Sequence, residues 1–225
     1  MTIHFHSEME RLKKMILSLG AMAEESAEMA IRAVSEHDVD LALEVADRDR
    51  VIDEHEVRVE EECLKIIALH QPVANDLRYL IAMLKINHDL ERIGDLAVDI
   101  AEQVPDLDRD SALAYANDLW ELARMSRRHV ADAIQSVIQL DPQRARRVWR
   151  EDDAIDDRHE ELENRILADL PTHVEDIRTL FHLAAIARSF ERMGDHATNI
   201  AKDVIYMVEG EIARHRGKEF KPNPK

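Results

Sequence analysis

Apolar residues recur every three or four positions along most of this chain, which is the spacing of one face of an α-helix. The pattern predicts six long helices separated by short breaks. Proline marks three of the breaks, because it cannot continue a helix but fits a first turn: Pro72, Pro142 and Pro171. The predicted helices cover about residues 7–36, 39–70, 73–104, 111–140, 142–170 and 172–209.

A pentapeptide in the third predicted helix returns in the sixth. Residues 91–95 (ERIGD) match residues 191–195 (ERMGD) at an offset of 100 residues. Further upstream the halves match at an offset of 103, so that the expected helix cap Asp38 corresponds to Asp141. Such repetition indicates an internal duplication. The sequence therefore predicts an all-α fold of two pseudo-symmetric three-helix bundles.

The breaks also predict the division of the chain. We expect the first bundle in residues 1–104, a linker in 105–110 and the second bundle in 111–209. Residues 210–225 form a basic, proline-containing tail, which we expect to be mobile.

Composition narrows the classes of function. A formal charge of −17 disfavours nucleic acid as a partner, since phosphate backbones would be repelled. A single cysteine, Cys63, forms no internal disulfide, which favours a reducing, cytoplasmic setting. No apolar run approaches the ~20 residues of a membrane-spanning helix. Charged residues near the N-terminus replace the apolar segment of a signal peptide, so we expect none.

Each half contains two pairs of acidic residues spaced four apart, which places both members of a pair on one helical face. The two pairs of a half are equidistant from the turn that joins their helices, so an antiparallel hairpin would bring them to the same level. The eight carboxylates are Asp49, Asp53, Glu91 and Asp95 in the first half and Asp152, Asp156, Glu191 and Asp195 in the second.

Four level carboxylates repel one another, and a multivalent cation removes that repulsion. Carboxylate ligands suit the hard ions magnesium, calcium, manganese and ferric iron, and zinc also accepts them although it usually binds histidine or cysteine. The residues do not select among these ions. Asp99 and Asn199, one turn further on, are candidates for additional metal ligands. The alternative is a solvated face that forms salt bridges with Arg92 and Arg192. Because the carboxylates lie opposite the apolar stripe, we expect both sites on the bundle surface.

These motifs, together with residues 69–78 (LHQPVANDLR) and 195–201 (DHATNIA), resemble the PhoU family over about residues 8–209. The resemblance implies two three-helix bundles with multinuclear iron or zinc clusters at the eight carboxylates. It also implies a non-enzymatic, cytoplasmic negative regulator of phosphate uptake and of the phosphate-starvation response. The expected partners are the nucleotide-binding subunit of a phosphate ABC transporter and a phosphate-sensing histidine kinase. We also expect a homodimer and no direct insertion into a membrane.

Two other functions fit the residues. A carboxylate-bridged metal centre could activate water and hydrolyse phosphoesters. Against this, the sequence reveals no group of Lys, Arg or His suited to a transition-state phosphate. A metal-free helical adaptor that docks basic patches on its acidic faces is the other alternative.

Overall fold

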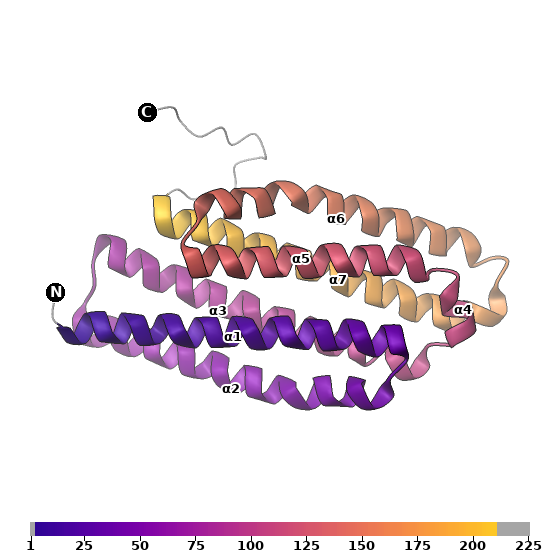
Figure 1. Ribbon diagram of the computed structural model, residues 1–225, viewed down its shortest axis with the longest axis horizontal. Coiled ribbons are helices and arrows are strands. Elements are labelled where there is room, and N and C mark those ends of the chain that lie inside the picture. The colour runs from indigo at the N-terminus through magenta and orange to yellow at the C-terminus, as the bar shows by residue number, and fades with distance from the viewer. Residues whose placement is uncertain (1–2, 211–225) are drawn as a thin grey trace.

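The computed structural model describes residues 3–210, and these residues fold into helices arranged as two bundles (Figure 1). The helices are α1 (Ile3–Glu36), α2 (Val39–His70), α3 (Ala74–Ala101), α4 (Arg109–Leu113), α5 (Ala116–Gln139), α6 (Pro142–Asp169) and α7 (Ile177–Glu209), with 3-10 turns at Val104–Asp106 and Val174–Asp176. No helix within this range combines the length and hydropathy needed to cross a membrane.

Side-chain caps begin equivalent helices of the two halves. The Asp38 carboxylate accepts a hydrogen bond from the Leu41 amide at 2.9 Å, at the start of α2. Asp141 accepts from the amides of Gln143 and Arg144 at the start of α6. Each cap satisfies amide groups that the first helical turn leaves without an intrahelical partner. The predicted correspondence between Asp38 and Asp141 is therefore visible in the structure.

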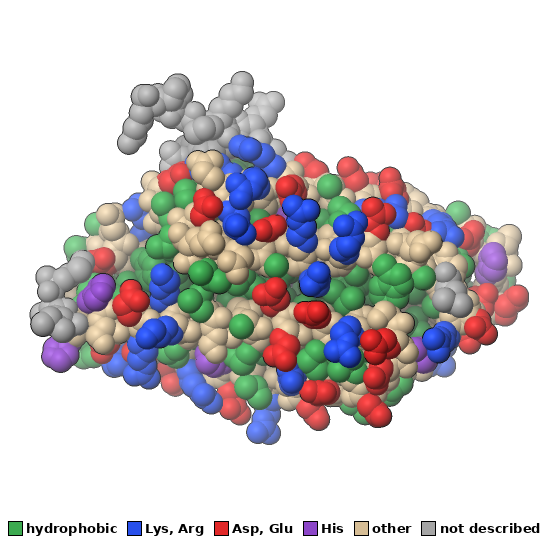
Figure 2. Space-filling view, viewed as in Figure 1, with side chains coloured by type: hydrophobic (Ala, Val, Ile, Leu, Met, Phe, Trp, Pro, Cys, Tyr) green, Lys and Arg blue, Asp and Glu red, His purple; other side chains and the backbone are tan. Residues whose placement is uncertain are grey.

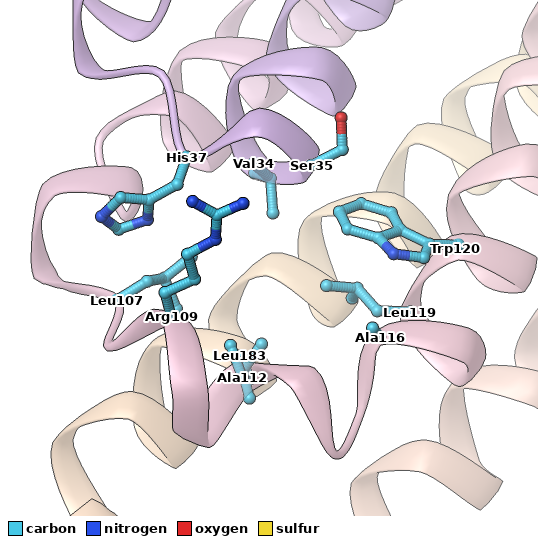
Figure 3. Close-up of a pocket in the computed structure, with 10 residues that line it drawn as sticks. All are labelled: Val34, Ser35, His37, Leu107, Arg109, Ala112, Ala116, Leu119, Trp120 and Leu183. Carbon is cyan, nitrogen blue, oxygen red and sulfur yellow. The ribbon is translucent and has the colours of Figure 1, made fainter.

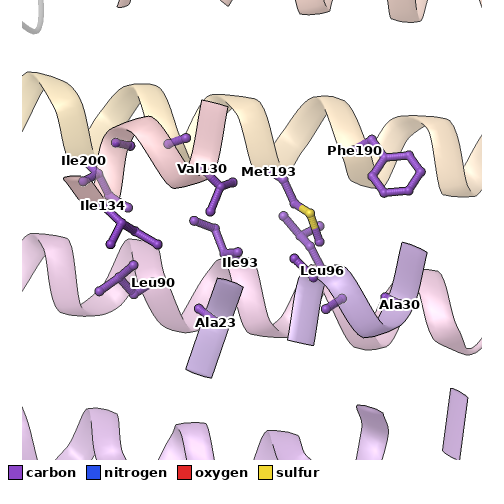
Figure 4. Packing of buried hydrophobic residues seen from close by; sticks show 14 of the residues in the cluster. Ala23, Ala30, Leu90, Ile93, Leu96, Val130, Ile134, Phe190, Met193 and Ile200 are labelled. Atoms are coloured by element: carbon purple, nitrogen blue, oxygen red, sulfur yellow. The ribbon is translucent and has the colours of Figure 1, made fainter. Parts of the chain in front are cut away.

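The two bundles share one apolar core at the contact between α3 and α7. Ile93 of α3 and Met193 of α7 are fully or almost fully buried, and both side chains point into the space between the two helices (Figure 4). These residues occupy the third position of the two repeated pentapeptides. The third residue of each pentapeptide thus joins the two halves. The acidic first and last residues lie on a different side of the helix. The all-α fold of two three-helix bundles is confirmed.

The predicted fourth helix is wrong in one respect, because α4 ends at Leu113 and α5 begins at Ala116. The intervening Tyr115 is 4% exposed, and its hydroxyl donates to Asp169 of α6 at 2.7 Å. Arg165 of α6 donates to the Ala114 carbonyl at 2.9 Å. The Arg165 contact gives the Ala114 carbonyl a donor, and the Tyr115 contact ties the break to α6. The predicted linker at 105–110 likewise contains a 3-10 turn and the start of α4.

A small cavity of about 100 Å³ lies where this broken segment meets the turn between α1 and α2 (Figure 3). Its walls are mostly apolar and include Val34, Leu119, Trp120 and Leu183. No carboxylate lines it, so it has none of the chemistry predicted for the acidic motifs. The predicted mobile tail, apart from Gly210, lies outside the described residues.

The glycines of the repeated pentapeptides allow close helix packing. A Cβ atom on Gly94 would lie 3.0 Å from Ile52 Cδ1 of α2, and one on Gly194 would lie 3.2 Å from Ile155 Cδ1 of α6. The structure therefore favours tight packing of α2 on α3 and of α6 on α7. The added Gly94 Cβ would also lie 3.6 Å from an oxygen of Asp49, so the packing brings that carboxylate close to α3.

We predict that Gly94→Ala and Gly194→Ala each lower the free energy of unfolding. Overpacking costs about 1–3 kcal/mol, more than the roughly 1 kcal/mol gained in helix propensity. Gly20→Ala is the matched control, because its Cβ would meet Ile134 at 3.4 Å, an ordinary contact, so this substitution should stabilise. Urea titration of the three variants measures these effects. Equal stabilisation by all three would contradict close packing at the motifs.

Candidate metal sites

The structure brings three of the four predicted carboxylates together in each half. Asp49 and Asp53 of α2 and Asp95 of α3 each place an oxygen within 4.8 Å of the others. Asp152 and Asp156 of α6 and Asp195 of α7 do the same in the second half. The spacing of four residues aligns each α2 or α6 pair, and the antiparallel hairpin supplies the third carboxylate at the same level.

The fourth predicted carboxylate of each half lies outside these triads. Glu91 is one turn from Asp95, and its Oε2 lies 3.3 Å from Nε of Arg92 and 3.7 Å from Nδ1 of His88. Arg92 also donates to Asp95 Oδ2 at 2.6 Å, so this guanidinium bridges the two acidic residues of the pentapeptide. Glu191 is half-buried and is likewise absent from the second triad.

Burial and mutual repulsion disfavour the charged forms of these groups. Burial, together with repulsion from Asp53 and other nearby carboxylates, raises the pKa of Asp49 to about 6. Burial, followed by repulsion from Asp95, raises the pKa of Glu91 to about 7, although the Arg92 charge opposes the shift. In the second half, burial is also the main reason why the pKa is raised in Asp156, Glu191 and Asp195.

One orphaned atom shows that the first triad suits a cation. Asp49 Oδ1 is buried and has no hydrogen-bond partner among the described residues. A buried carboxylate oxygen without a donor is costly unless a cation or proton neutralises it. The triad offers only oxygen ligands, which hard cations such as Mg²⁺, Ca²⁺ and Mn²⁺ prefer. The donor set therefore fits a multivalent cation.

In the second triad, a buried carboxylate oxygen receives a hydrogen bond from a neighbouring side chain. Thr198 donates its hydroxyl hydrogen to Asp152 Oδ1 at 2.8 Å, and His129 Nε2 lies 2.9 Å from the Thr198 oxygen. Asp152 is 8% exposed, so the expectation that every carboxylate lies on the surface is wrong for this residue. The equivalent positions of the first half are Val98 and Ser26, which leaves Asp49 without this donor.

A cavity of about 310 Å³ opens beside the first triad and combines groups from both halves. Asp49, Asp95 and Asp99 contribute carboxylates to its walls. Arg92 of α3 and Arg192 and His196 of α7 contribute basic groups. The sequence interpretation missed this grouping, because the arginine and histidine of the second repeat reach the first site only through the contact between α3 and α7.

The two candidates for additional ligands have different surroundings. Asp99 lines the cavity of the first triad, and its charge contributes to the raised pKa of Asp49. Asn199 lines a separate open cavity with Lys85, His88 and Asp89. Across this region Asp89 accepts a hydrogen bond from His196 Nδ1 at 2.8 Å, which ties α3 to α7. The structure thus associates Asp99, but not Asn199, with a carboxylate cluster.

A comparison with models of protein families shows the family to which the chain belongs. The model of the PhoU domain matches twice, at residues 16–104 and 119–204, so both halves are covered. The chain belongs to the PhoU family. The two matched segments correspond to the two bundles, which agrees with the duplication found in the sequence.

Individual PhoU relatives resemble the chain along most of its length. It is 35% identical over 209 residues to the phosphate-specific transport system accessory protein PhoU homolog of Aquifex aeolicus, covering 93% of this chain and 95% of the relative. It is 31% identical over 213 residues to the phosphate-specific transport system accessory protein PhoU of Serratia marcescens, covering 95% of this chain and 88% of that relative.

A solved structure shows the same fold. The crystal structure of PhoU from Pseudomonas aeruginosa superposes with a TM-score of 0.86 at 29% sequence identity. The similarity covers 92% of this chain and 100% of that one.

We predict that the metal-free protein becomes less stable as the pH rises. Asp49 and Glu91 hold protons more tightly in the folded chain than in the unfolded chain, where such groups titrate near pH 4. Their stabilising contribution is therefore fully present below about pH 4 and is lost as the pH rises through about 6 to 7. Thermal melts in a chelator between pH 5 and pH 8 should show a falling melting temperature.

The double substitution Asp49→Asn with Glu91→Gln should reduce this slope, since neither neutral side chain titrates. The exposed Glu163→Gln is the matched control. An unchanged slope in the double variant would show that the first site is not the source of the pH dependence.

Proposed function

We propose that this PhoU-family protein is a metal-binding, non-enzymatic regulator of phosphate transport. It acts in the cytoplasm as a negative regulator of phosphate uptake and of the phosphate-starvation response. It works as a homodimer and by contact with the nucleotide-binding subunit of a phosphate ABC transporter and with a phosphate-sensing histidine kinase. The names of its relatives as accessory proteins of phosphate-specific transport systems support this role.

The observation that carries the metal-binding part is the duplicated carboxylate triad. An isolated acidic cluster is commonly a solvated surface feature. Here two triads with oxygens within 4.8 Å occur at equivalent levels, and one contains a buried oxygen without a hydrogen-bond partner in residues 3–210. Repulsion within each triad destabilises the folded chain at neutral pH. A bound cation offsets this repulsion, so folding and cation binding favour each other.

The protein groups have distinct roles in this proposal. Asp49, Asp53 and Asp95 hold the cation of the first site and connect α2 to α3, with Glu91 and Asp99 as candidates for additional ligands. Asp152, Asp156 and Asp195 hold the cation of the second site and connect α6 to α7, with Glu191 in the position of Glu91. The cation, which is iron, zinc, manganese or magnesium, neutralises carboxylates that would otherwise repel one another.

A second function has one observation in its favour. Arg92, Arg192 and His196 line the cavity beside the first triad, so basic groups adjoin a candidate metal site. That arrangement would suit a phosphoester held against a metal-activated water. Arg92 is already paired with Asp95 and Glu91, which lowers its availability. Turnover of phosphoester substrates by protein loaded with Mn²⁺ or Mg²⁺, abolished by Arg192→Ala, would favour the hydrolase over the regulator.

We predict that the protein binds cations at two independent sites. Asp95→Ala and Asp195→Ala should each remove about half of the bound metal while the fold survives, because each triad belongs to its own bundle. Elemental analysis measures the metal content, and thermal melts with Mn²⁺, Zn²⁺ or ferric ion measure the stabilisation of the folded state. Asp157→Ala, beside the second triad but outside it, is the matched control.

Loss of all metal from one substitution would contradict two independent sites. Unchanged melting temperatures at saturating concentrations of every ion would contradict metal binding and would favour the metal-free adaptor.

We predict salt-sensitive binding to the transporter subunit or the kinase. The acidic faces of a chain with a formal charge of −17 should attract basic patches on these partners, and such contacts weaken as ionic strength rises. Pull-down with purified partners at low and high salt, with and without metal, measures this. Deletion of the gene should derepress phosphate-starvation genes in phosphate-rich medium. Absence of binding to both partners at low salt would leave the regulator without its proposed mechanism.

A further inference from the structure

The two halves carry opposite charge on equivalent helices. Residues 122–150, in α5 and the start of α6, contain seven arginines and two acidic residues, a formal charge of +5. The equivalent residues 19–47, in α1 and the start of α2, contain one arginine and eight acidic residues, a formal charge of −7. Buried positions confirm this correspondence, since Leu19 and Ala30 are buried like Leu122 and Ala133.

The reversal of charge occurs at individual equivalent positions of the two halves. Four exposed arginines stand where the first half has acidic residues, and we name these two sets the arginine face and the acidic face. The arginine face comprises Arg127, Arg128, Arg147 and Arg150, and the acidic face comprises Glu24, Glu25, Glu44 and Asp47.

The arginine face is largely unpaired. Asp132 joins two helices by accepting from Arg144 at 3.0 Å and lying 3.6 Å from Arg128. Arg127, Arg147 and Arg150 have no acidic partner within 4.0 Å in the described part of the chain. Figure 2 shows a row of Lys and Arg side chains across the surface formed by α5 and α6.

The acidic face has the complementary arrangement. A single cation, Arg48, lies between its helices, 2.7 Å from Glu25 and 3.1 Å from Glu44. Glu24 and Asp47 have no basic partner within 4.0 Å in residues 3–210. Each face therefore combines unpaired charges of one sign with one central residue of the other sign, Asp132 or Arg48.

Both faces look to the same side of the molecule. Helices α1 and α5 contact each other and run in opposite directions in front of α3 and α7 (Figure 1). The pseudo-two-fold axis that relates the bundles therefore points toward the viewer. Rotation about this axis leaves the equivalent surfaces of the two bundles facing the same side of the molecule. The cavity of the first triad is lined from α2, α3 and α7, whereas the two faces lie on α1, α2, α5 and α6 and include none of its lining residues.

We propose that the arginine face of one copy docks on the acidic face of a second copy, and that two-fold symmetry makes this contact twice. This is the surface we assign to the proposed homodimer, and it depends on the fold rather than on bound metal. Two-fold pairing closes the assembly, because each copy uses both faces. Nucleic acid or an anionic membrane would have to approach a chain with a formal charge of −17, whereas a second copy offers matched acids at the same spacing.

Charge exchange tests the proposal. One variant carries Arg127→Glu, Arg147→Glu and Arg150→Glu, a second carries Glu24→Arg, Glu44→Arg and Asp47→Arg, and a third carries all six. Sedimentation and light scattering at low and high salt measure the mass, and circular dichroism confirms folding. The wild type should sediment at low salt with twice the 25.9 kDa mass of one chain, and high salt should weaken the dimer.

Each triple variant should weaken dimerisation at least about 100-fold, because like charges then face each other twice. The sixfold variant should recover to within about tenfold of the wild type, since its faces are again complementary. A wild type that stays monomeric at low salt, dimers that survive in both triple variants, or a folded sixfold variant that stays monomeric would each overturn the proposal. So would a monomer whose arginine face binds phosphatidylserine vesicles, because a membrane would then be its partner.

Discussion

Repulsion between carboxylates held at one level of two packed helices is the constraint on which this structure depends. Gly94 lets Ile52 approach α3 closely, and the same approach brings Asp49 within reach of Asp95. The packing that stabilises the hairpin therefore concentrates negative charge beside it. Burial then raises the pKa of Asp49 to about 6 and that of Glu91 to about 7. A cation that replaces this repulsion with attraction would connect α2 to α3 more firmly than the apolar contacts alone.

Both halves contain this repulsion between carboxylates, and each half compensates for it in a different way. In the second half Thr198, backed by His129, donates to Asp152, so one buried carboxylate is satisfied by the protein itself. In the first half Val98 and Ser26 stand at these positions, and Asp49 retains an oxygen without a donor. The outer surfaces differ as well, since α5 and α6 carry arginines at four positions where α1 and α2 carry acidic residues. The two halves therefore share a fold and a site plan but have different local electrostatics.

Much of the fold and part of the site follow from local patterns. Periodic apolar residues, capping aspartates and prolines predict the long helices, and the spacing of Asp49, Asp53 and Asp95 about Pro72 predicts their meeting. Features that depend on contacts between residues far apart in the chain cannot be predicted from these local patterns. The break before α5 depends on Tyr115 and Arg165 bonding to groups about fifty residues distant in the chain. Arg192 and His196 join the first cavity only because α7 packs on α3.

Anomalous scattering from crystals grown with Mn²⁺ tests whether both carboxylate triads bind a cation. We expect one or more manganese peaks in each half, about 2.0–2.6 Å from carboxylate oxygens. In the first half these oxygens belong to Asp49, Asp53 and Asp95, and in the second to Asp152, Asp156 and Asp195. Peaks at neither triad, in crystals saturated with the ion, would contradict the claim that the duplicated carboxylates are cation sites.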